Sequence, residues 1–115
     1  MDQLERAKKL VKSARDLFEK DELAGVAGLS YQAVEAAIIH LTDSQGSHSH
    51  RRAKAESLLK LSEDTLSSLW RARNIDFYGN EKIGEEQKEL DKEEILKSLK
   101  NAEKIIEQAS AKDIS

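Results

Sequence analysis

The chain has 115 residues, of which 38% are hydrophobic and 36% charged, and its formal net charge is −3. This length excludes a second domain of ordinary size, and the mixed charges exclude the overall basic character of general nucleic-acid binders. The absence of cysteine excludes disulfides, thiolate chemistry and cysteine-ligated metal sites.

The composition favours helices over strands, because proline is absent and glutamate, lysine, leucine and alanine are abundant. We therefore predict an all-α protein, a single domain over residues 1–115, built as an antiparallel up-and-down bundle of four long helices plus one short helix. The N-terminus, M-D-Q-L-E-R, lacks the apolar stretch of a secretion signal, and no apolar run approaches a membrane span. We expect a cytoplasmic protein without a membrane partner.

The first two predicted helices differ in character. Residues 2–20 carry apolar and charged side chains at the spacing of an amphipathic bundle helix. Residues 22–42 are apolar nearly all round, which predicts a helix buried on several sides, and their small side chains would let a neighbouring helix or a second subunit approach closely. Glu35 is the only charge in the middle of this segment, and an arginine from residues 70–80 is a candidate partner for it.

A polar segment at residues 42–52, T-D-S-Q-G-S-H-S-H-R-R, predicts the loop that leads into a short helix at about residues 50–61. It contains the only local basic cluster of the chain. The main members of this cluster are His48, His50, Arg51 and Arg52. Such a cluster either contacts a phosphate backbone, as an accessory basic patch, or arises by chance. Because the His-x-His pair has no third ligand nearby in the sequence, we predict no metal site.

The stretch W-R-A-R-N-I-D-F-Y-G-N, residues 70–80, combines cationic, polar and aromatic side chains. Ser62 as N-cap and Gly79 as a left-handed end delimit the helix that contains it. On this helix Trp70 falls on the packing side, and we expect it in the core beside the second helix. Four side chains are candidates for binding a phosphate or nucleotide: Arg71, Arg73, Asn74 and Tyr78. The alternative is a purely structural seam with an ion pair between Arg73 and Asp76.

The last helix has a well-defined start. Asp91 is the expected N-cap, Glu94 completes a capping box, and Leu90 is placed to contact Ile95. Apolar residues at helical spacing form its core face: Ile95, Leu99, Ala102, Ile106 and Ala109. We expect the residues after Ser110 to fray.

The order of these helices, together with one motif, resembles the HEPN domains, small helical bundles found beside minimal nucleotidyltransferases and in ribonuclease toxins. The family motif is an arginine, often followed by a polar residue, then a short spacer and a histidine near the end of the penultimate long helix. Arg73 and Asn74 match its opening, and Tyr78 stands where the histidine is expected.

The resemblance implies roles for these residues. In active relatives, paired motifs meet across a dimer interface, where the arginine binds the scissile phosphate and the histidine assists proton transfer. A free tyrosine has a pKa of about 10, so Tyr78 is a poor substitute for the histidine but a good hydrogen-bond donor to phosphate. Arg73 and Tyr78 are catalytic candidates only if ribonuclease activity survives this change. Some toxin-type relatives carry a tyrosine that the partner nucleotidyltransferase modifies, and Asn80 occupies that position here.

We therefore expect a non-catalytic HEPN-like subunit that binds nucleotide or RNA, needs no cofactor, forms a homodimer and acts with a separate minimal nucleotidyltransferase in a toxin–antitoxin-like pair. A metal-independent HEPN ribonuclease toxin is the first alternative, and a structural helical interaction protein is the second. The expected homodimer follows from the small residues of segment 22–42 and the apolar seam within residues 66–77, which exceed what a short chain needs to bury.

Overall fold

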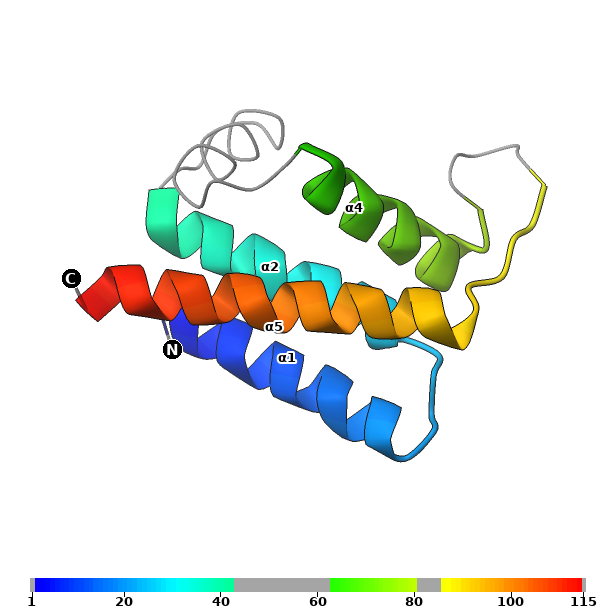
Figure 1. Cartoon of the computed structure of the whole chain (residues 1–115), viewed down its shortest axis with the longest axis horizontal. Helices are drawn as coiled ribbons and strands as arrows, with labels where there is room; N and C mark the ends of the chain where they lie inside the picture. Colours follow the sequence, from blue (N-terminus) through cyan, green and yellow to red (C-terminus); the bar gives the residue numbers. More distant parts are fainter. Residues whose placement is uncertain (1, 43–62, 81–85, 115) are drawn as a thin grey trace.

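The computed structural model describes residues 2–42, 63–80 and 86–114 of the chain. This part of the chain forms four α-helices and no strand: α1 (Gln3–Glu19), α2 (Val26–Thr42), α4 (Glu63–Tyr78) and α5 (Lys92–Ile114). Successive helices run in opposite directions, so both ends of the chain lie at the same end of the bundle (Figure 1). The predicted all-α bundle is confirmed for the described residues, while the short helix expected at about 50–61 lies outside them.

Helix α2 is the centre of the bundle and packs against α1, α4 and α5. Its sequence is apolar around most of its circumference, and the prediction that it is buried on several sides is confirmed. On one side, Ala33, Ala36 and Ala37 share an apolar cluster with Leu4 and Ala7 of α1. Because these alanines are small, the two helices approach closely. The small-residue surface of α2 is therefore used inside the bundle.

The other side of α2 forms a core with α4 and α5. Its buried members are Tyr31, Val34, Ile38, Leu66, Leu69, Ala102 and Ile105. The predicted core face of α5 is confirmed, since all five of its residues are at most 5% exposed. Each fully buried leucine or isoleucine contributes about 1.5–3 kcal/mol relative to an exposed one.

Local capping accounts for the starts of α1 and α5. The backbone N–H of Glu5 donates to Asp2 Oδ1 at 2.8 Å, and that of Glu94 donates to Asp91 Oδ1 at 2.8 Å. The backbone N–H of Asp91 donates in return to Glu94 Oε1 at 3.4 Å, which confirms the capping box. Helix α5 continues to Ile114, and the expected fraying after Ser110 stays a prediction. The turn before this end is held by Ala109, which is fully buried.

Helix α2 begins at Val26, later than the predicted residue 22. Gly25, just before it, has a positive φ of 89° and no side chain to cap the helix. Asp76 of α4 supplies the cap instead. Its Oδ1 accepts from the backbone N–H of Gly25 at 3.0 Å, and its Oδ2 accepts from that of Gly28 at 2.8 Å. A carboxylate is favourable at this position, because the N-terminus of a helix carries positive partial charge.

Trp70 lies beside α2, as predicted, but the prediction that it belongs to the core is wrong. Its side of α4 borders the buried face formed by Leu66, Leu69, Ala72 and Ile75, and Trp70 remains 37% exposed. The indole packs edge-on against Tyr31 of α2, with ring centroids 5.2 Å apart. Trp70 therefore lies at the boundary between the core and the surface.

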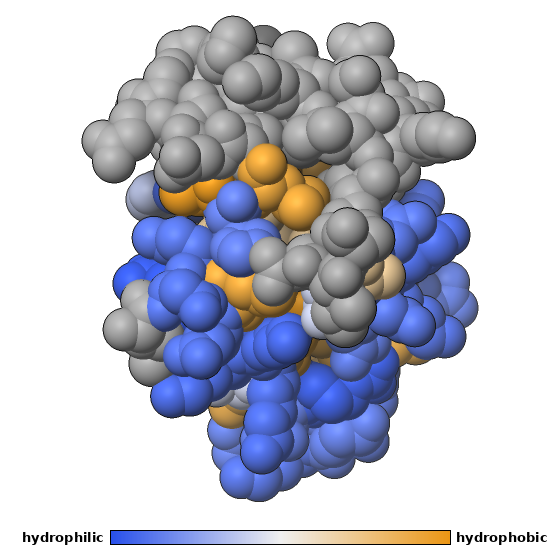
Figure 2. All heavy atoms as spheres, turned by 90° about the vertical axis from the view of Figure 1, so that its left-hand side faces the viewer, coloured by the Kyte–Doolittle hydropathy of each residue, from blue (hydrophilic) through white to orange (hydrophobic). Residues whose placement is uncertain are grey.

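The surface of the bundle is mainly polar where it can be seen. Figure 2 shows the end of the bundle at which both termini lie, and the lower part of this end is covered by hydrophilic side chains.

Between α1 and α5, Arg15 donates two hydrogen bonds to the carboxylate of Glu103, and these hydrogen bonds raise the pKa of the guanidinium above its usual value. Among the described helices, none combines the length and hydrophobicity needed to cross a membrane.

Candidate functional site

The candidate site is built around Arg73 of α4, whose guanidinium lies among aromatic rings. Its central carbon is 4.8 Å from the ring centroid of Trp70, 5.3 Å from Tyr78, 5.7 Å from Phe77 and 6.0 Å from Tyr31. The chain has one tryptophan, two tyrosines and two phenylalanines, so four of its five rings surround this one cation. A guanidinium favours such surroundings because it is weakly hydrated and stacks on ring faces. We call these five residues the Arg73 aromatic cluster.

Helix geometry explains the cluster. Trp70 and Phe77 lie three residues before and four residues after Arg73, on the same side of α4, and Tyr31 joins them from α2. The end of α4 approaches α2 closely at Gly28. A Cβ atom there would lie 2.1 Å from two ring carbons of Phe77, so glycine makes room for this ring. Gly79 then ends α4 with a φ of 76°, as the sequence predicts.

Asn74 orients the arginine. Its Oδ1 accepts a hydrogen bond from Arg73 Nη1 at 2.9 Å, and its side chain is largely buried. Arg73 Nε is also buried, yet it has no hydrogen-bond partner within the described residues. A buried donor without a partner costs about 1–3 kcal/mol. The site therefore contains a fixed positive charge with an unused donor, which an acceptor from a ligand would satisfy.

The rings over Arg73 are open to solvent. Tyr78 is 62% exposed, Phe77 40% and Trp70 37%. Large apolar side chains with such exposure are informative when they lie together, because contiguous apolar patches mark binding surfaces. Stacking on a nucleobase and contact with another protein surface are both available to these three rings.

The structure brings together three of the four predicted ligand-binding residues: Arg73, Asn74 and Tyr78. Arg71 is separate. Two residues along a helix correspond to a rotation of about 200°, and Arg71 accordingly lies toward α5, with its Nη1 3.6 Å from Glu94 Oε2. The accessory patch of His48, His50, Arg51 and Arg52 lies outside the described residues, so its role stays a prediction.

One expected ion pair is corrected by the geometry. Asp76 binds the start of α2 and makes no ion pair with Arg73. This difference arises from the rotation of α4 about its axis, which decides the neighbour that each side chain meets. Glu35 lines a shallow hollow on the side of α1, together with Arg6, and its pairing with an arginine of residues 70–80 stays a prediction.

Sequence reasoning missed the capping role of Asp76, because its two hydrogen-bond partners lie about 50 residues earlier in the chain.

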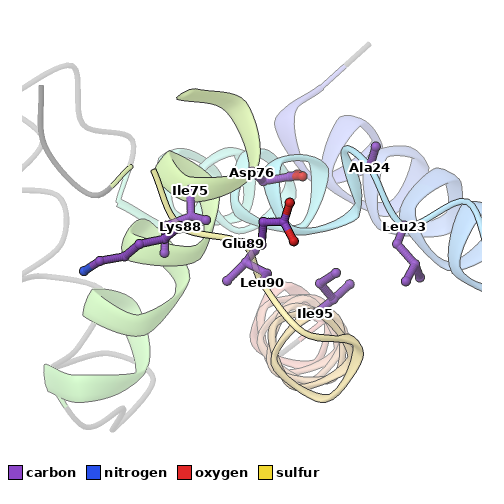
Figure 3. A pocket seen from close by; sticks show the side chains of 8 residues that line it. All are labelled: Leu23, Ala24, Ile75, Asp76, Lys88, Glu89, Leu90 and Ile95. Atoms are coloured by element: carbon purple, nitrogen blue, oxygen red, sulfur yellow. The ribbon is translucent and has the colours of Figure 1, made fainter. Parts of the chain in front are cut away.

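Asp76 also lines a hollow of about 410 Å³ where the end of α4 meets the start of α5 (Figure 3). Glu89 adds a second carboxylate there, and Lys88 is the only cation among the described residues of the lining. Two carboxylates beside one ammonium group do not suit the binding of a phosphate, which is itself an anion. Within the described ranges, no group of three or more histidine, aspartate or glutamate residues is placed to hold a metal.

The chemistry of the Arg73 aromatic cluster is that of anion binding beside a stacking surface. The only histidine in the described part of the chain is His40, in the last turn of α2. Asp76, two residues before Tyr78, lies against the first turn of the same helix. At a rise of 1.5 Å per residue, that turn is about 20 Å along α2 from His40. No imidazole from the described residues therefore reaches Tyr78.

An antiparallel helical bundle with an arginine and a tyrosine presented at the end of one long helix defines a small all-α protein with a candidate phosphate or nucleotide site. The sequence profile of the HEPN domain matches residues 1–112, and the chain belongs to this family. No curated protein matches the chain in a sequence comparison. The predicted family is thereby confirmed, while the significance of tyrosine at the motif's histidine position stays a prediction.

Proposed function

We propose that this protein is a non-catalytic HEPN subunit that binds the phosphate of a nucleotide or RNA through Arg73, with Asn74 and Tyr78, and works as a homodimer with a separate minimal nucleotidyltransferase. Membership of the HEPN family supports a nucleotide- or RNA-related role. The observation that carries the proposal is the state of Arg73: one hydrogen bond, one unsatisfied buried Nε, and exposed aromatic rings on its open side.

Each residue has a defined part in the proposed binding. The Arg73 guanidinium donates charge-assisted hydrogen bonds to phosphate oxygens, and Asn74 holds it in place. The hydroxyl of Tyr78 donates a further bond. Trp70 or Tyr78 offers a face on which a base stacks, a contact worth about 1–3 kcal/mol per base in other proteins.

Trp70 provides the means to test this binding. It is the only tryptophan, and its ring lies 4.8 Å from the Arg73 guanidinium, so a ligand on Arg73 should change its fluorescence. We expect a single-stranded oligoribonucleotide or a nucleotide to give a saturable change in the wild type. Arg73→Ala should weaken binding at least about tenfold, since hydrogen bonds to charged groups are worth about 1.5–3 kcal/mol.

Lys9→Ala is the matched control. Lys9 is exposed on α1, and its replacement also removes one positive charge. Binding by Lys9→Ala should equal that of the wild type, and circular dichroism should show Arg73→Ala folded. Equal affinity of wild type and Arg73→Ala for every ligand tried would contradict the proposed site.

The proposed homodimer has a specific surface. Because small residues of α2 are buried within the bundle, we assign the interface with a second copy to the large apolar side chains that are exposed in the described part of the chain: Trp70, Phe77 and Tyr78. Light scattering after size exclusion should give twice the 12.9 kDa chain mass, and Phe77→Ser should shift this mass toward the monomer. A monomeric wild type at tens of micromolar would remove the dimer from the proposal.

A further inference from the structure

The ring of Phe77 links the start of α2 to the Arg73 aromatic cluster. It rests against the backbone of α2 at Gly28, where a Cβ atom would lie 2.1 Å from two of the ring carbons. It also lies 5.7 Å from the guanidinium carbon of Arg73, and its centroid is 6.4 Å from that of the Tyr78 ring, in an edge-on arrangement. Phe77 therefore adjoins two of the three residues proposed to bind the ligand.

The position of this ring requires a glycine at residue 28. Non-bonded carbon atoms pack about 3.5–4.0 Å apart, so the ring could not stay where it is beside any larger residue. The backbone itself does not require glycine there, because the glycines with a positive φ in the described part of the chain are Gly25 and Gly79. Gly28 lies within α2, and alanine is a better helix former than glycine. Room for the Phe77 ring is therefore what Gly28 provides.

The backbone of α4 is held at this place and cannot retreat from a larger residue. Asp76, which precedes Phe77, accepts hydrogen bonds from the backbone N–H groups of Gly25 at 3.0 Å and Gly28 at 2.8 Å. The Phe77 side chain, in contrast, is 40% exposed and has room to turn toward solvent. A methyl group at position 28 would therefore displace the ring and leave the two helices in place.

The Arg73 side chain depends on its neighbours for a fixed position. An arginine has many rotamers, and rotamer freedom that is lost on binding lowers the affinity for a ligand. Asn74 holds Nη1 through a hydrogen bond of 2.9 Å, whereas Nε is buried without a hydrogen-bond partner among the described residues. Apolar rings around the guanidinium also exclude water, which strengthens its attraction for an anion. Displacement of the Phe77 ring would loosen the guanidinium and admit water to it.

We propose that Gly28 is a positioning residue of the Arg73 site. By leaving room for the Phe77 ring against α2, it keeps this ring beside the guanidinium of Arg73 and the ring of Tyr78, and so maintains the arrangement that binds the ligand. The inference rests on the ligand site proposed at Arg73. It gives α2 a part in ligand binding that acts through Phe77, without contact between Gly28 and the ligand.

The Nε–H signal of Arg73 in a ¹H–¹⁵N NMR spectrum of the full chain tests the positioning without any ligand. Arg73→Lys lacks this group and therefore assigns the signal. We expect slow exchange with water in the wild type, because Nε is buried. Gly28→Ala should make the exchange at least about tenfold faster, since displacement of the ring opens the site. Exchange as slow in Gly28→Ala as in the wild type would overturn the inference and leave the proposed ligand site standing.

Trp70 fluorescence with a single-stranded oligoribonucleotide measures the effect on affinity, at a protein concentration at which light scattering gives the same mass for all variants. Gly28→Ala should weaken binding about fivefold to tenfold. Its thermal midpoint should stay within about 5 °C of the wild type, because alanine favours the helix. Unchanged affinity in Gly28→Ala would overturn the inference. Absence of binding by the wild type would contradict the proposed function instead, and the exchange of the Arg73 Nε–H would still decide the role of Gly28.

Two controls separate positioning from a general loosening of the fold. Gly25→Ala is the matched substitution, because a Cβ atom there meets nothing within 4 Å although the φ of 89° strains an alanine. It should lower the thermal midpoint and leave both the affinity and the Nε–H exchange as in the wild type. In a Phe77→Ala background, Gly28→Ala should change neither quantity further, because the ring through which it acts is gone. Equal effects of Gly28→Ala with and without the Phe77 ring, or matching losses in Gly25→Ala, would overturn the assignment to Gly28.

Discussion

Purified wild-type protein is expected to leave labelled single-stranded RNA intact in excess EDTA, and Tyr78→His is expected to gain cleavage. General acid and base steps each contribute about 100- to 10,000-fold, and no histidine from the described residues reaches the site. A histidine at position 78 would stand where the tyrosine ring now lies, 5.3 Å from the Arg73 guanidinium. It would add a proton carrier next to the group that holds the phosphate.

Arg73→Ala, alone and combined with Tyr78→His, controls for contaminating nuclease. Activity gained in Tyr78→His and lost in the double variant would support the proposed non-catalytic binding site. Cleavage by wild type that disappears in Arg73→Ala would establish a ribonuclease instead, with His48 and His50 as the first candidates for the proton carrier. Inactivity of both wild type and Tyr78→His would show that catalysis needs more than the one histidine.

Asp76→Ala is expected to lower the free energy of unfolding by about 2–3 kcal/mol. The substitution removes both hydrogen-bond acceptors from the start of α2. Hydrogen bonds to a charged group are worth about 1.5–3 kcal/mol each, and hydrogen bonds from the two N–H groups to water would offset part of this loss. The loss of negative charge from the helix N-terminus adds to this cost. Urea unfolding followed by circular dichroism measures the change.

Two comparisons test the cause of this destabilisation. Asp76→Asn keeps the shape and one acceptor oxygen, so it should cost about half as much as Asp76→Ala. Asp16→Ala, at an exposed position of α1, should change stability by no more than about 0.5 kcal/mol. If Asp76→Ala were as mild as Asp16→Ala, the capping contacts would contribute little to stability.

Local features of the sequence predict much of the fold correctly. The 3.6-residue period identifies the core face of α5, and the apolar circumference of α2 indicates its central position. The Asp91–Glu94 capping box and the left-handed Gly79 involve only neighbouring residues, so sequence spacing is sufficient to find them. Arg73, Asn74 and Tyr78 are likewise close together, because they lie within two turns of one helix.

Contacts between distant segments required the tertiary structure. Periodicity shows which face of a helix is apolar, but the packing of the bundle sets the rotation of that face and the neighbour it meets. This rotation leaves Trp70 partly exposed and places Glu35 toward α1. It also directs Arg71 to α5 while Arg73 lies among the aromatic rings, and it brings Asp76 to the start of α2. A single stretch of α4 thereby serves two sides of the molecule, because residues two positions apart on a helix point in nearly opposite directions.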